Sequence, residues 1–354
     1  MRTGFAGRLE NHTENVMTKM RAMVVPAGGA KLQVVEREVP EPGPREVRIR
    51  VQACGVCHSD AMTVQGQMPG LKYPRIPGHE VIGTLEAIGP DVDGWHVGTR
   101  VGVGWFPGHC GYCIPCRHGD SFACENIQGA TGVTRDGGYA THMLAHVTAL
   151  ARVPIELDVV ESAPLLCAGI TTFNALRHSG AGPGDLVAIH GVGGLGHLGI
   201  QFAARLGYRV VAVNRGRDKE QLARSLGARE YIDSSEGDPA AALRNLGGAR
   251  AILATVSDAA AMQAIVGGLG VNGTMLVIGA VGAITVDSLE LLRKRAAVRG
   301  WYSGTGVDSE DTLLFSQRHK IASMNEIYSL EQAQAAYDRM ISGKARFRVV
   351  LKVE

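Results

Sequence analysis

Short apolar strands alternate with helices between residues 186 and 280, and this alternation restricts the fold more than any other feature of the chain. The segments with the continuous apolar character of buried strands are LVAIHG (186–191), RVVAVN (209–214), AILATV (251–256) and TMLVIGA (274–280). The segments between them with apolar residues at helical spacing are 195–207, 219–227 and 260–269. Strands that alternate with helices of about ten residues form βαβ units. We therefore expect an α/β domain with a doubly wound parallel sheet.

The loop after the first of these strands, HGVGGLGHLG (190–199), is rich in glycine. It contains the pattern G-x-G-x-x-G, which is typical of dinucleotide binding when a strand precedes it and a helix follows. Glycine lets the backbone approach a pyrophosphate, and the helix N-terminus supplies amide groups and the positive end of its dipole. The residues predicted to contact the cofactor are Gly191, Gly193, Gly194, Leu195 and Gly196.

The end of the second strand bears on the choice between NAD and NADP. An acidic residue there would bind the ribose 2′-hydroxyl of NAD, but the chain has Asn214, followed by Arg215 and Arg217. A neutral side chain removes the repulsion that a 2′-phosphate would meet, and an arginine pairs with phosphate in forked geometry. These residues favour NADP(H). Lys219, at the start of the next helical segment, is also predicted to bind the cofactor. NAD(H) stays possible if both arginines are solvated loop charges.

The first part of the chain has a β-rich pattern. Residues 22–53 alternate polar and apolar side chains between prolines, and similar runs at 81–89 and 99–106 predict further short strands and turns. The segment 161–180 has apolar residues at helical spacing and ends on Gly180, so we expect one helix there.

The final strand, FRVVLKV (347–353), fits the β-rich part better than the parallel sheet. The nucleotide-binding domain is therefore predicted to be inserted into a catalytic domain. The predicted divisions are 21–176 and 312–354 for the catalytic domain and 177–311 for the nucleotide domain. Residues 1–20 are predicted to form a loosely ordered extension, because the strand-like AMVV begins only at Ala22.

The composition is that of an ordinary globular chain and argues against several classes of function. Of 354 residues, 45% are hydrophobic and 20% are charged, the formal net charge is +2, and no block of like charge occurs. This balance gives no argument for nucleic-acid binding. No run approaches the roughly 18 apolar residues that span a bilayer, and the N-terminus lacks the apolar core of a secretory signal. We therefore expect a cytoplasmic protein without nucleic-acid or membrane partners.

Four of the seven cysteines stand together in the pattern C-x2-C-x2-C-x7-C, as Cys110, Cys113, Cys116 and Cys124. In a chain without an export signal, such a cluster indicates metal binding rather than disulfides. Four thiolates at this spacing wrap a tetrahedral zinc ion, and a site closed by four protein ligands is structural. An iron–sulfur cluster uses the same ligands and is a less favoured alternative.

The motifs GVCHSD and GHE indicate a second metal site, of mixed ligands. Cys57 and His79 are of the types that zinc prefers, and a catalytic zinc site has three protein ligands and one open position. Asp60 can accept the second ring N–H of His79 and fix its tautomer, and Glu80 adds another carboxylate. A third ligand must come from elsewhere in the chain. Cys54 is predicted to be a packed core thiol.

In order and spacing, GVCHSD, GHE, the four-cysteine loop, LLCAGITTFNAL and GVGGLG resemble the motifs of the zinc-dependent medium-chain alcohol dehydrogenases. The resemblance covers nearly everything from about residue 20 to the end. It implies a GroES-like β-rich catalytic domain and a Rossmann domain. It also implies NAD(P)-linked oxidation of an alcohol to an aldehyde or ketone, in a homodimer or homotetramer with a catalytic and a structural zinc ion in each chain.

Carried over residue by residue, the resemblance assigns the metal ligands. Cys57, His79 and Cys167 match the ligands of the catalytic zinc, so Cys167 is predicted to be the third ligand. Asp60 and Glu80 match the carboxylates behind these ligands.

The resemblance also suggests which residues meet the substrate and the nicotinamide. Ser59 stands where the family hydrogen-bonds the substrate hydroxyl, and His58 where a basic residue reaches the pyrophosphate. Thr171 lies in the segment that lines the nicotinamide pocket. One departure concerns Met62, because many members have a histidine there that ends a proton relay. Either Ser59 and the ribose hydroxyls pass the proton to water directly, or another group such as His58 takes over.

The expected function is hydride transfer between a small alcohol or aldehyde and a nicotinamide cofactor. If Trp105, Trp301 and Tyr302 shape the pocket, they favour unhindered primary alcohols or aldehydes. The alternatives are a polyol or other secondary-alcohol dehydrogenase, a zinc-less quinone reductase, and a non-catalytic nucleotide-binding relative. The last two are disfavoured because the complete set of zinc ligand types is present.

Overall fold

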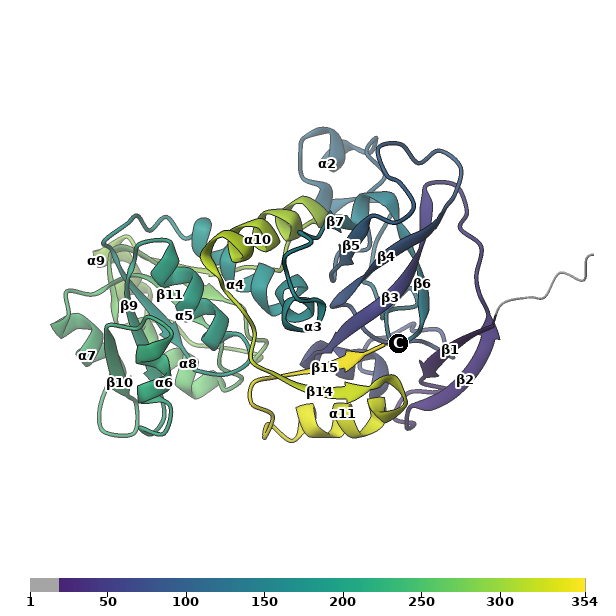
Figure 1. Ribbon diagram of the computed structural model, residues 1–354. Coiled ribbons are helices and arrows are strands. Elements are labelled where there is room, and N and C mark those ends of the chain that lie inside the picture. Colours follow the sequence, from purple (N-terminus) through teal and green to yellow (C-terminus); the bar gives the residue numbers. More distant parts are fainter. Residues whose placement is uncertain (1–18, 354) are drawn as a thin grey trace, which may run out of the picture.

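The computed structural model describes residues 19–353, and its strands form two large sheets and one small sheet. Figure 1 shows the two large sheets in separate halves of the molecule. The middle of the chain builds the left half, whereas the first and last strands lie together in the right half. We call these the nucleotide half and the β-rich half.

Six strands form the sheet of the nucleotide half, and every neighbouring pair is parallel. Their spatial order is β10 (Glu230–Asp233), β9 (Arg209–Asn214), β8 (Leu186–His190), β11 (Ala249–Ala254), β12 (Leu269–Val277) and β13 (Ala297–Gly300). The helices of this half are α5 (Gly196–Arg205), α6 (Glu220–Ser225), α7 (Pro239–Asn245), α8 (Ala259–Val266) and α9 (Ser288–Lys294).

Apolar layers cover both faces of this sheet. Ile189 of β8 belongs to the apolar cluster that includes α5 and α6, whereas the preceding Ala188 belongs to the cluster of α7 and α8. Successive strand residues thus point toward opposite helix layers, and the prediction of a doubly wound parallel sheet is confirmed. The chain order of the strands reverses between β8 and β11, and such folds bind ligands in the crevice at this point.

The sheet of the β-rich half has seven strands and is mostly antiparallel. They are β14 (Asn325–Ser329), β15 (Arg348–Lys352), β3 (Glu46–Val56), β4 (Val81–Ile88), β5 (Arg100–Val103), β7 (Leu150–Arg152) and, also beside β3, β6 (His142–His146). A separate antiparallel pair consists of β1 (Lys19–Val24) and β2 (Gln33–Glu38). Because β15 pairs with β3, the prediction that the last strand joins the β-rich part is confirmed.

The prediction of a single helix over residues 161–180 is wrong. This stretch contains α3 (Val159–Ser162), the 3₁₀ segment η4 (Ala163–Leu166) and α4 (Ala168–Arg177), with a bend of 53° between η4 and α4. Cys167 stands at the bend with φ −130° and ψ −72°, which is not helical. Proline in the first turn of η4 has no amide proton to donate, so the chain starts a new segment there.

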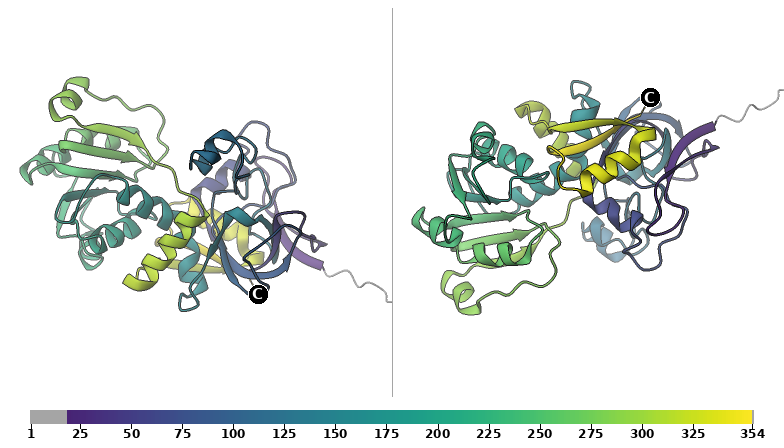
Figure 2. Two further views of the ribbon diagram at one scale, coloured as in Figure 1. Left: turned by 90° about the horizontal axis from the view of Figure 1, so that it is seen from above. Right: turned by 90° about the horizontal axis from the view of Figure 1, so that it is seen from below.

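The remaining helical segments are short, except α10. They are η1 (His58–Asp60), α1 (Ala61–Val64), α2 (Ile114–Arg117), η2 (Ser121–Ala123), η3 (Val147–Ala149), α10 (Gly306–His319), η5 (Leu330–Gln332) and α11 (Ala333–Ile341). Helix α10 packs against both α4 and β7, and Figures 1 and 2 show it between the two halves. The domain boundary predicted at residue 312 therefore falls inside a helix that touches both halves.

Most of the predicted N-terminal extension, residues 1–20, lies outside the described residues. Lys19 and Met20 belong to β1, which begins before the expected Ala22.

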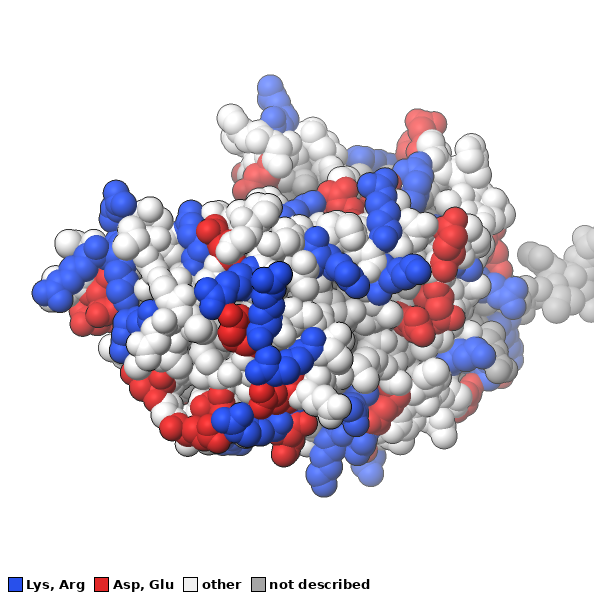
Figure 3. Space-filling view, turned by 60° about the vertical axis from the view of Figure 1, so that its left-hand side comes forward, with Lys and Arg blue, Asp and Glu red and all other residues white. Residues whose placement is uncertain are grey.

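Within residues 19–353, no single helix is long and apolar enough to cross a membrane. The bent pair formed by α3–η4 and α4 has the length and composition of a membrane span, but it meets these two criteria only. On the face shown in Figure 3, basic and acidic side chains are interspersed.

Candidate functional site

Four side chains of zinc-binding type converge between the two halves. They are Cys57, His79, Glu80 and Cys167, and their ligand atoms all lie within 4.8 Å of one another. Cys57 directly follows β3, and His79 and Glu80 directly precede β4, so the pairing of these strands brings them together. Cys167 arrives from the bend before α4, and its Sγ lies 3.7 Å from that of Cys57.

Asp60 holds two members of this cluster in place. Its Oδ1 lies 3.0 Å from Nδ1 of His79, and its Oδ2 accepts hydrogen bonds from the Cys57 amide (2.9 Å) and the Tyr139 hydroxyl (2.8 Å). The carboxylate thus fixes the His79 tautomer that carries the proton on Nδ1. Among the described residues, Nε2 of His79 has no hydrogen-bond partner, so this nitrogen is available as a ligand.

The electrostatics of the two thiols favour one thiolate. The hydrogen bond from Cys167 lowers the pKa of Cys57 well below its usual value, and the same contact raises the pKa of Cys167. Burial opposes a charge on His79, but Asp60 beside it raises the pKa of that ring well above its usual value. A buried cluster of this kind is suited to bind a metal cation, because a bound metal ion stabilises deprotonated thiols and neutral imidazole.

Glu80 lies among the ligand atoms, as a further carboxylate of the cluster, whereas the resemblance predicts it behind them. Its Oε1 forms an ion pair with Arg348, and its Oε2 has no partner within the described chain. Burial raises the pKa of Glu80 to about 7, against the opposing effect of Arg348. Gly55 makes room for this side chain, since a Cβ there would lie 1.8 Å from Oε2 of Glu80.

Sequence reasoning missed Arg348. It is the first residue of β15, it is 6% exposed, and it pairs with Glu80 across the sheet. A Cβ added to Gly194 would lie 3.2 Å from its Cδ, so the same side chain reaches from the metal-ligand cluster to the glycine loop. The one available signal was a single arginine in the otherwise apolar strand FRVVLKV, since buried charges are rare unless paired.

The four remaining clustered cysteines form a second group. Cys110, Cys113, Cys116 and Cys124 have their Sγ atoms within 4.8 Å of one another. Backbone amides donate to these sulfurs, from Cys113 to Sγ of Cys110 and from Ile127 to Sγ of Cys124, both at 3.4 Å. Four convergent sulfurs that accept amide hydrogen bonds fit a tetrahedral zinc ion. Cys54 lies outside both groups, fully buried in the apolar core.

The glycine loop joins β8 to α5 at the crevice of the parallel sheet. Gly196 opens α5, and a Cβ there would lie 1.7 Å from the carbonyl oxygen of Gly191, so only glycine fits. Gly191 has a φ of 98°, a conformation that side chains with a Cβ rarely adopt. Gly191, Gly193, Gly194 and Leu195 line a cleft of about 480 Å³.

The loop after β9 forms the other side of this cleft, through Asn214, Arg215 and Lys219. Oδ1 of Asn214 accepts the Val192 amide at 3.1 Å, and Nζ of Lys219 donates to the Val192 carbonyl at 2.7 Å. Arg215 is exposed, and within residues 19–353 it forms no side-chain hydrogen bond or ion pair.

Arg217 differs from Arg215, with which the sequence groups it. Its guanidinium donates to both carboxylate oxygens of Glu236, at 3.0 and 2.6 Å, and to Glu220 at 3.0 Å. Each of its three nitrogens is therefore already bonded to a carboxylate, and Arg217 does not line the cleft.

Three further predicted residues lie near the ligand cluster, and within residues 19–353 none of their side chains forms a hydrogen bond with it. His58 and Ser59 lie on η1 directly after Cys57; His58 is exposed and Ser59 is half-buried. Thr171 is buried on α4, one turn after Cys167, whose carbonyl accepts its amide at 2.9 Å. Met62, on α1, is half-buried.

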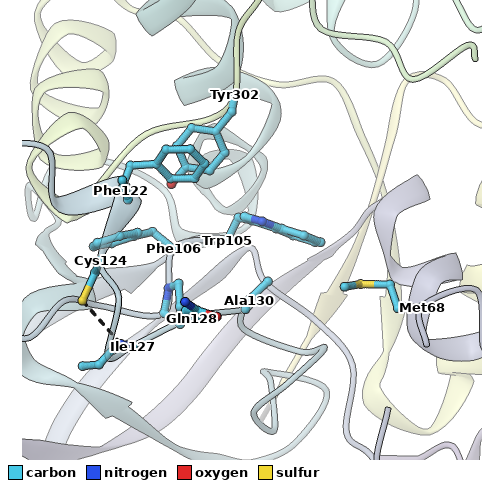
Figure 4. A pocket seen from close by; sticks show the side chains of 12 residues that line it. Met68, Trp105, Phe106, Phe122, Cys124, Ile127, Gln128, Ala130 and Tyr302 are labelled. Carbon is cyan, nitrogen blue, oxygen red and sulfur yellow. Dashed lines mark hydrogen bonds between the residues drawn. The ribbon is translucent and has the colours of Figure 1, made fainter. Parts of the chain in front are cut away.

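A hydrophobic cavity adjoins the ligand cluster. The ring of Trp105 lies edge-on to that of His79, at 4.9 Å between centroids, and Trp105 also lines a cavity of about 410 Å³. Figure 4 shows Trp105 near the middle of this cavity, Met68 on one side, and Phe122 and Tyr302 together at another. A compact apolar cavity beside convergent polar groups is the usual form of a small-molecule site.

Comparisons with known proteins agree with this geometry. The family model described as "Alcohol dehydrogenase GroES-like domain" matches residues 43–155, and the model described as "Zinc-binding dehydrogenase" matches residues 194–316. The alcohol dehydrogenase notN of Aspergillus sp. (strain MF297-2) is 43% identical over 92% of this chain and 96% of its own. The chain belongs to the zinc-dependent medium-chain alcohol dehydrogenase family.

Other members of this family are similar over nearly the whole length. An alcohol dehydrogenase of Geobacillus stearothermophilus is 37% identical over 95% of this chain and 100% of its own. The solved structure of a cinnamyl alcohol dehydrogenase from Sorghum bicolor superposes with a TM-score of 0.83, at 27% identity, over 95% of this chain and 98% of its own. The β-rich half is therefore a GroES-like domain and the nucleotide half a Rossmann domain, and the protein is an oxidoreductase.

Proposed function

We propose that this protein is an NADP(H)-dependent alcohol dehydrogenase or aldehyde reductase that transfers hydride between a primary alcohol or aldehyde and the nicotinamide. The observation that carries the proposal is the convergence of Cys57, His79 and Cys167 beside an apolar cavity. Nε2 of His79 and Oε2 of Glu80 are buried and have no hydrogen-bond partner within residues 19–353, and two sulfurs complete a donor set that suits zinc.

In this proposal, Cys57, His79 and Cys167 hold the catalytic zinc, and Asp60 orients His79. A zinc ion bound there supplies a Lewis acid for the substrate oxygen, which lowers the pKa of an alcohol toward neutrality. Glu80, paired with Arg348, offers a further carboxylate to the same site. The side chain of Trp105 excludes water from the metal site and packs against the hydrophobic part of the substrate.

The residues after Cys57 move the proton. Ser59, half-buried on η1, hydrogen-bonds the substrate hydroxyl and passes its proton outward. The exposed His58 is adjacent to Ser59 in the chain and takes the proton onward, because Met62 cannot carry one. Thr171 borders the nicotinamide, and Arg348 links the catalytic cluster to the pyrophosphate loop.

The preference for NADP(H) rests on the guanidinium of Arg215, which has no side-chain partner in the described part of the chain, and on the neutral Asn214 in the same cleft. The cysteine loop holds a second, structural zinc ion, which keeps residues 110–124 folded against the β-rich half. As in the resemblance above, we expect a homodimer or homotetramer.

Metal content and cofactor use test this proposal together. Purified enzyme is expected to contain two zinc ions per chain by plasma mass spectrometry. It is expected to reduce aldehydes with NADPH at a higher kcat/KM than with NADH, and to prefer primary to secondary alcohols. One zinc ion per chain would refute the catalytic site, whereas equal use of secondary alcohols or polyols would favour the alternative substrate class.

A further inference from the structure

A stack of two aromatic rings connects the two halves of the molecule. Phe122 belongs to η2 in the cysteine loop, and Tyr302 follows β13 of the Rossmann domain. Their ring centroids lie 3.5 Å apart, with an interplanar angle of 29°. Figure 4 shows both rings together at one end of the cavity that Trp105 lines.

The same two rings border two cavities. The first, of about 410 Å³, contains Trp105 and Met68, and the second, of about 770 Å³, extends past Trp301 toward α10. Phe122 and Tyr302 are common to both linings. The stack is therefore a partition, and replacing either ring by a methyl group would open the first cavity into the second.

The lining of the first cavity selects for hydrophobic groups. It is composed mainly of aromatic and aliphatic side chains, and Gln128 is its one amide side chain. The Tyr302 hydroxyl already donates its proton to the Gly304 carbonyl at 3.0 Å, so it has no proton left to donate to a substrate oxygen. Such walls stack favourably on an aromatic ring, but they leave the hydroxyl groups of a polyol without partners.

We propose that the Phe122–Tyr302 stack is the end wall of the substrate cavity and limits the length of the alcohol or aldehyde. The preferred substrate then carries one aromatic ring, or a hydrophobic group of that size, on its reacting carbon. This inference rests on the proposed function, because it assigns the cavity beside Trp105 to the hydrophobic part of the substrate. The two rings act on specificity alone and take no part in hydride transfer.

The test uses the zinc-loaded enzyme with NADPH and para-alkyl benzaldehydes of rising length. In Phe122→Ala and Tyr302→Ala, kcat/KM for 4-butylbenzaldehyde relative to benzaldehyde is expected to rise about tenfold, the usual effect of removing a steric limit in an apolar pocket. Tyr302→Phe keeps the ring and is expected to keep the parent ratio. Tyr112→Ala removes a ring from the same loop that is 68% exposed, and it serves as the matched control.

A binding measurement separates this inference from the proposed function. Calorimetric titration with benzamides of the same lengths reports the cavity without turnover, and the ratio of affinities is expected to shift as kcat/KM does. Phe122→Leu replaces the alanine variant if that variant fails to fold. An unchanged affinity ratio in both ring-deletion variants overturns the inference. A shifted affinity ratio in an enzyme that turns over no aldehyde refutes the proposed function alone.

Discussion

The two arginines after β9 make a sharp test of cofactor choice, because they differ in what already holds them. Arg215 lines the cofactor cleft and forms no side-chain ion pair within the described chain. Arg217 lies two residues on, but Glu236 and Glu220 occupy its guanidinium. Replacing each by alanine removes the same charge from the same loop, so the pair of variants separates a direct contact from a general loss of positive charge.

The expected size of the effect follows from the contact that Arg215 is proposed to make. A hydrogen bond to a charged group contributes about 1.5–3 kcal/mol, and each 1.4 kcal/mol or so is a factor of ten in affinity. Arg215 is exposed and therefore partly screened by salt, so we expect the lower end of this range. Arg215→Ala should lower kcat/KM for NADPH about tenfold and leave kcat/KM for NADH nearly unchanged, because NADH has no 2′-phosphate.

Arg217→Ala should change the ratio of NADPH to NADH use much less. Its ion pairs are exposed, so their loss should leave stability nearly unchanged. The assay is initial-rate kinetics of aldehyde reduction with both cofactors, at low and at physiological salt. The reasoning is refuted if Arg215→Ala lowers kcat/KM equally for both cofactors. It is also refuted if Arg217→Ala costs as much NADPH preference as Arg215→Ala.

Four further substitutions test the other proposed contacts. Asn214→Asp should shift preference toward NADH, because a carboxylate repels the 2′-phosphate and accepts a bond from the ribose hydroxyl. Cys57→Ser should lower activity by more than the roughly 10–100-fold that follows from losing a contact to a metal ligand. The purified variant should contain close to one zinc ion per chain. Cys113→Ser should lower the melting temperature by about 10 °C, since loss of a metal costs at least about 4 kcal/mol and each kcal/mol shifts it by ~2–4 °C. Gly196→Ala should abolish tight NADPH binding in a fluorescence titration, because its Cβ would lie 1.7 Å from the Gly191 carbonyl.

Each of these has an outcome that would count against it. Unchanged cofactor preference in Asn214→Asp would show that residue 214 does not meet the 2′-phosphate. Full activity or two zinc ions in Cys57→Ser would exclude it as a required ligand. A melting temperature equal to that of the parent would remove the structural role of Cys113. Normal NADPH affinity in Gly196→Ala would mean that the pyrophosphate does not approach the loop there.

The sequence predicted those parts of the site whose geometry is set within one short segment of the chain. The spacing of Gly191, Gly193 and Gly196 between a strand and a helix is a property of one turn, and the structure has that turn. The C-x2-C-x2-C-x7-C loop likewise brings its sulfurs together within one short segment. Strand and helix alternation, which follows from hydrophobic period, correctly predicted the parallel sheet.

The exact composition of the catalytic cluster depended on contacts between distant segments. Cys57 and Cys167 are 110 residues apart, and they meet because the chain bends at Cys167 instead of continuing one helix from 161 to 180. Apolar spacing alone cannot show such a bend, because the apolar residues on both sides are buried against different neighbours. The resemblance to a family supplied Cys167; spacing within this sequence did not.

Tertiary structure alone decided the partners of the charged groups. The sequence grouped Arg215 with Arg217, but only the fold shows that Glu236 holds one and leaves the other beside the cofactor cleft. It also placed Glu80 beside Cys57, His79 and Cys167, and Arg348 against Glu80. The physical reason is that periodicity and local spacing determine strands, helices and turns, whereas the pairing of a buried charge depends on which segments the closed sheet brings within a few ångströms.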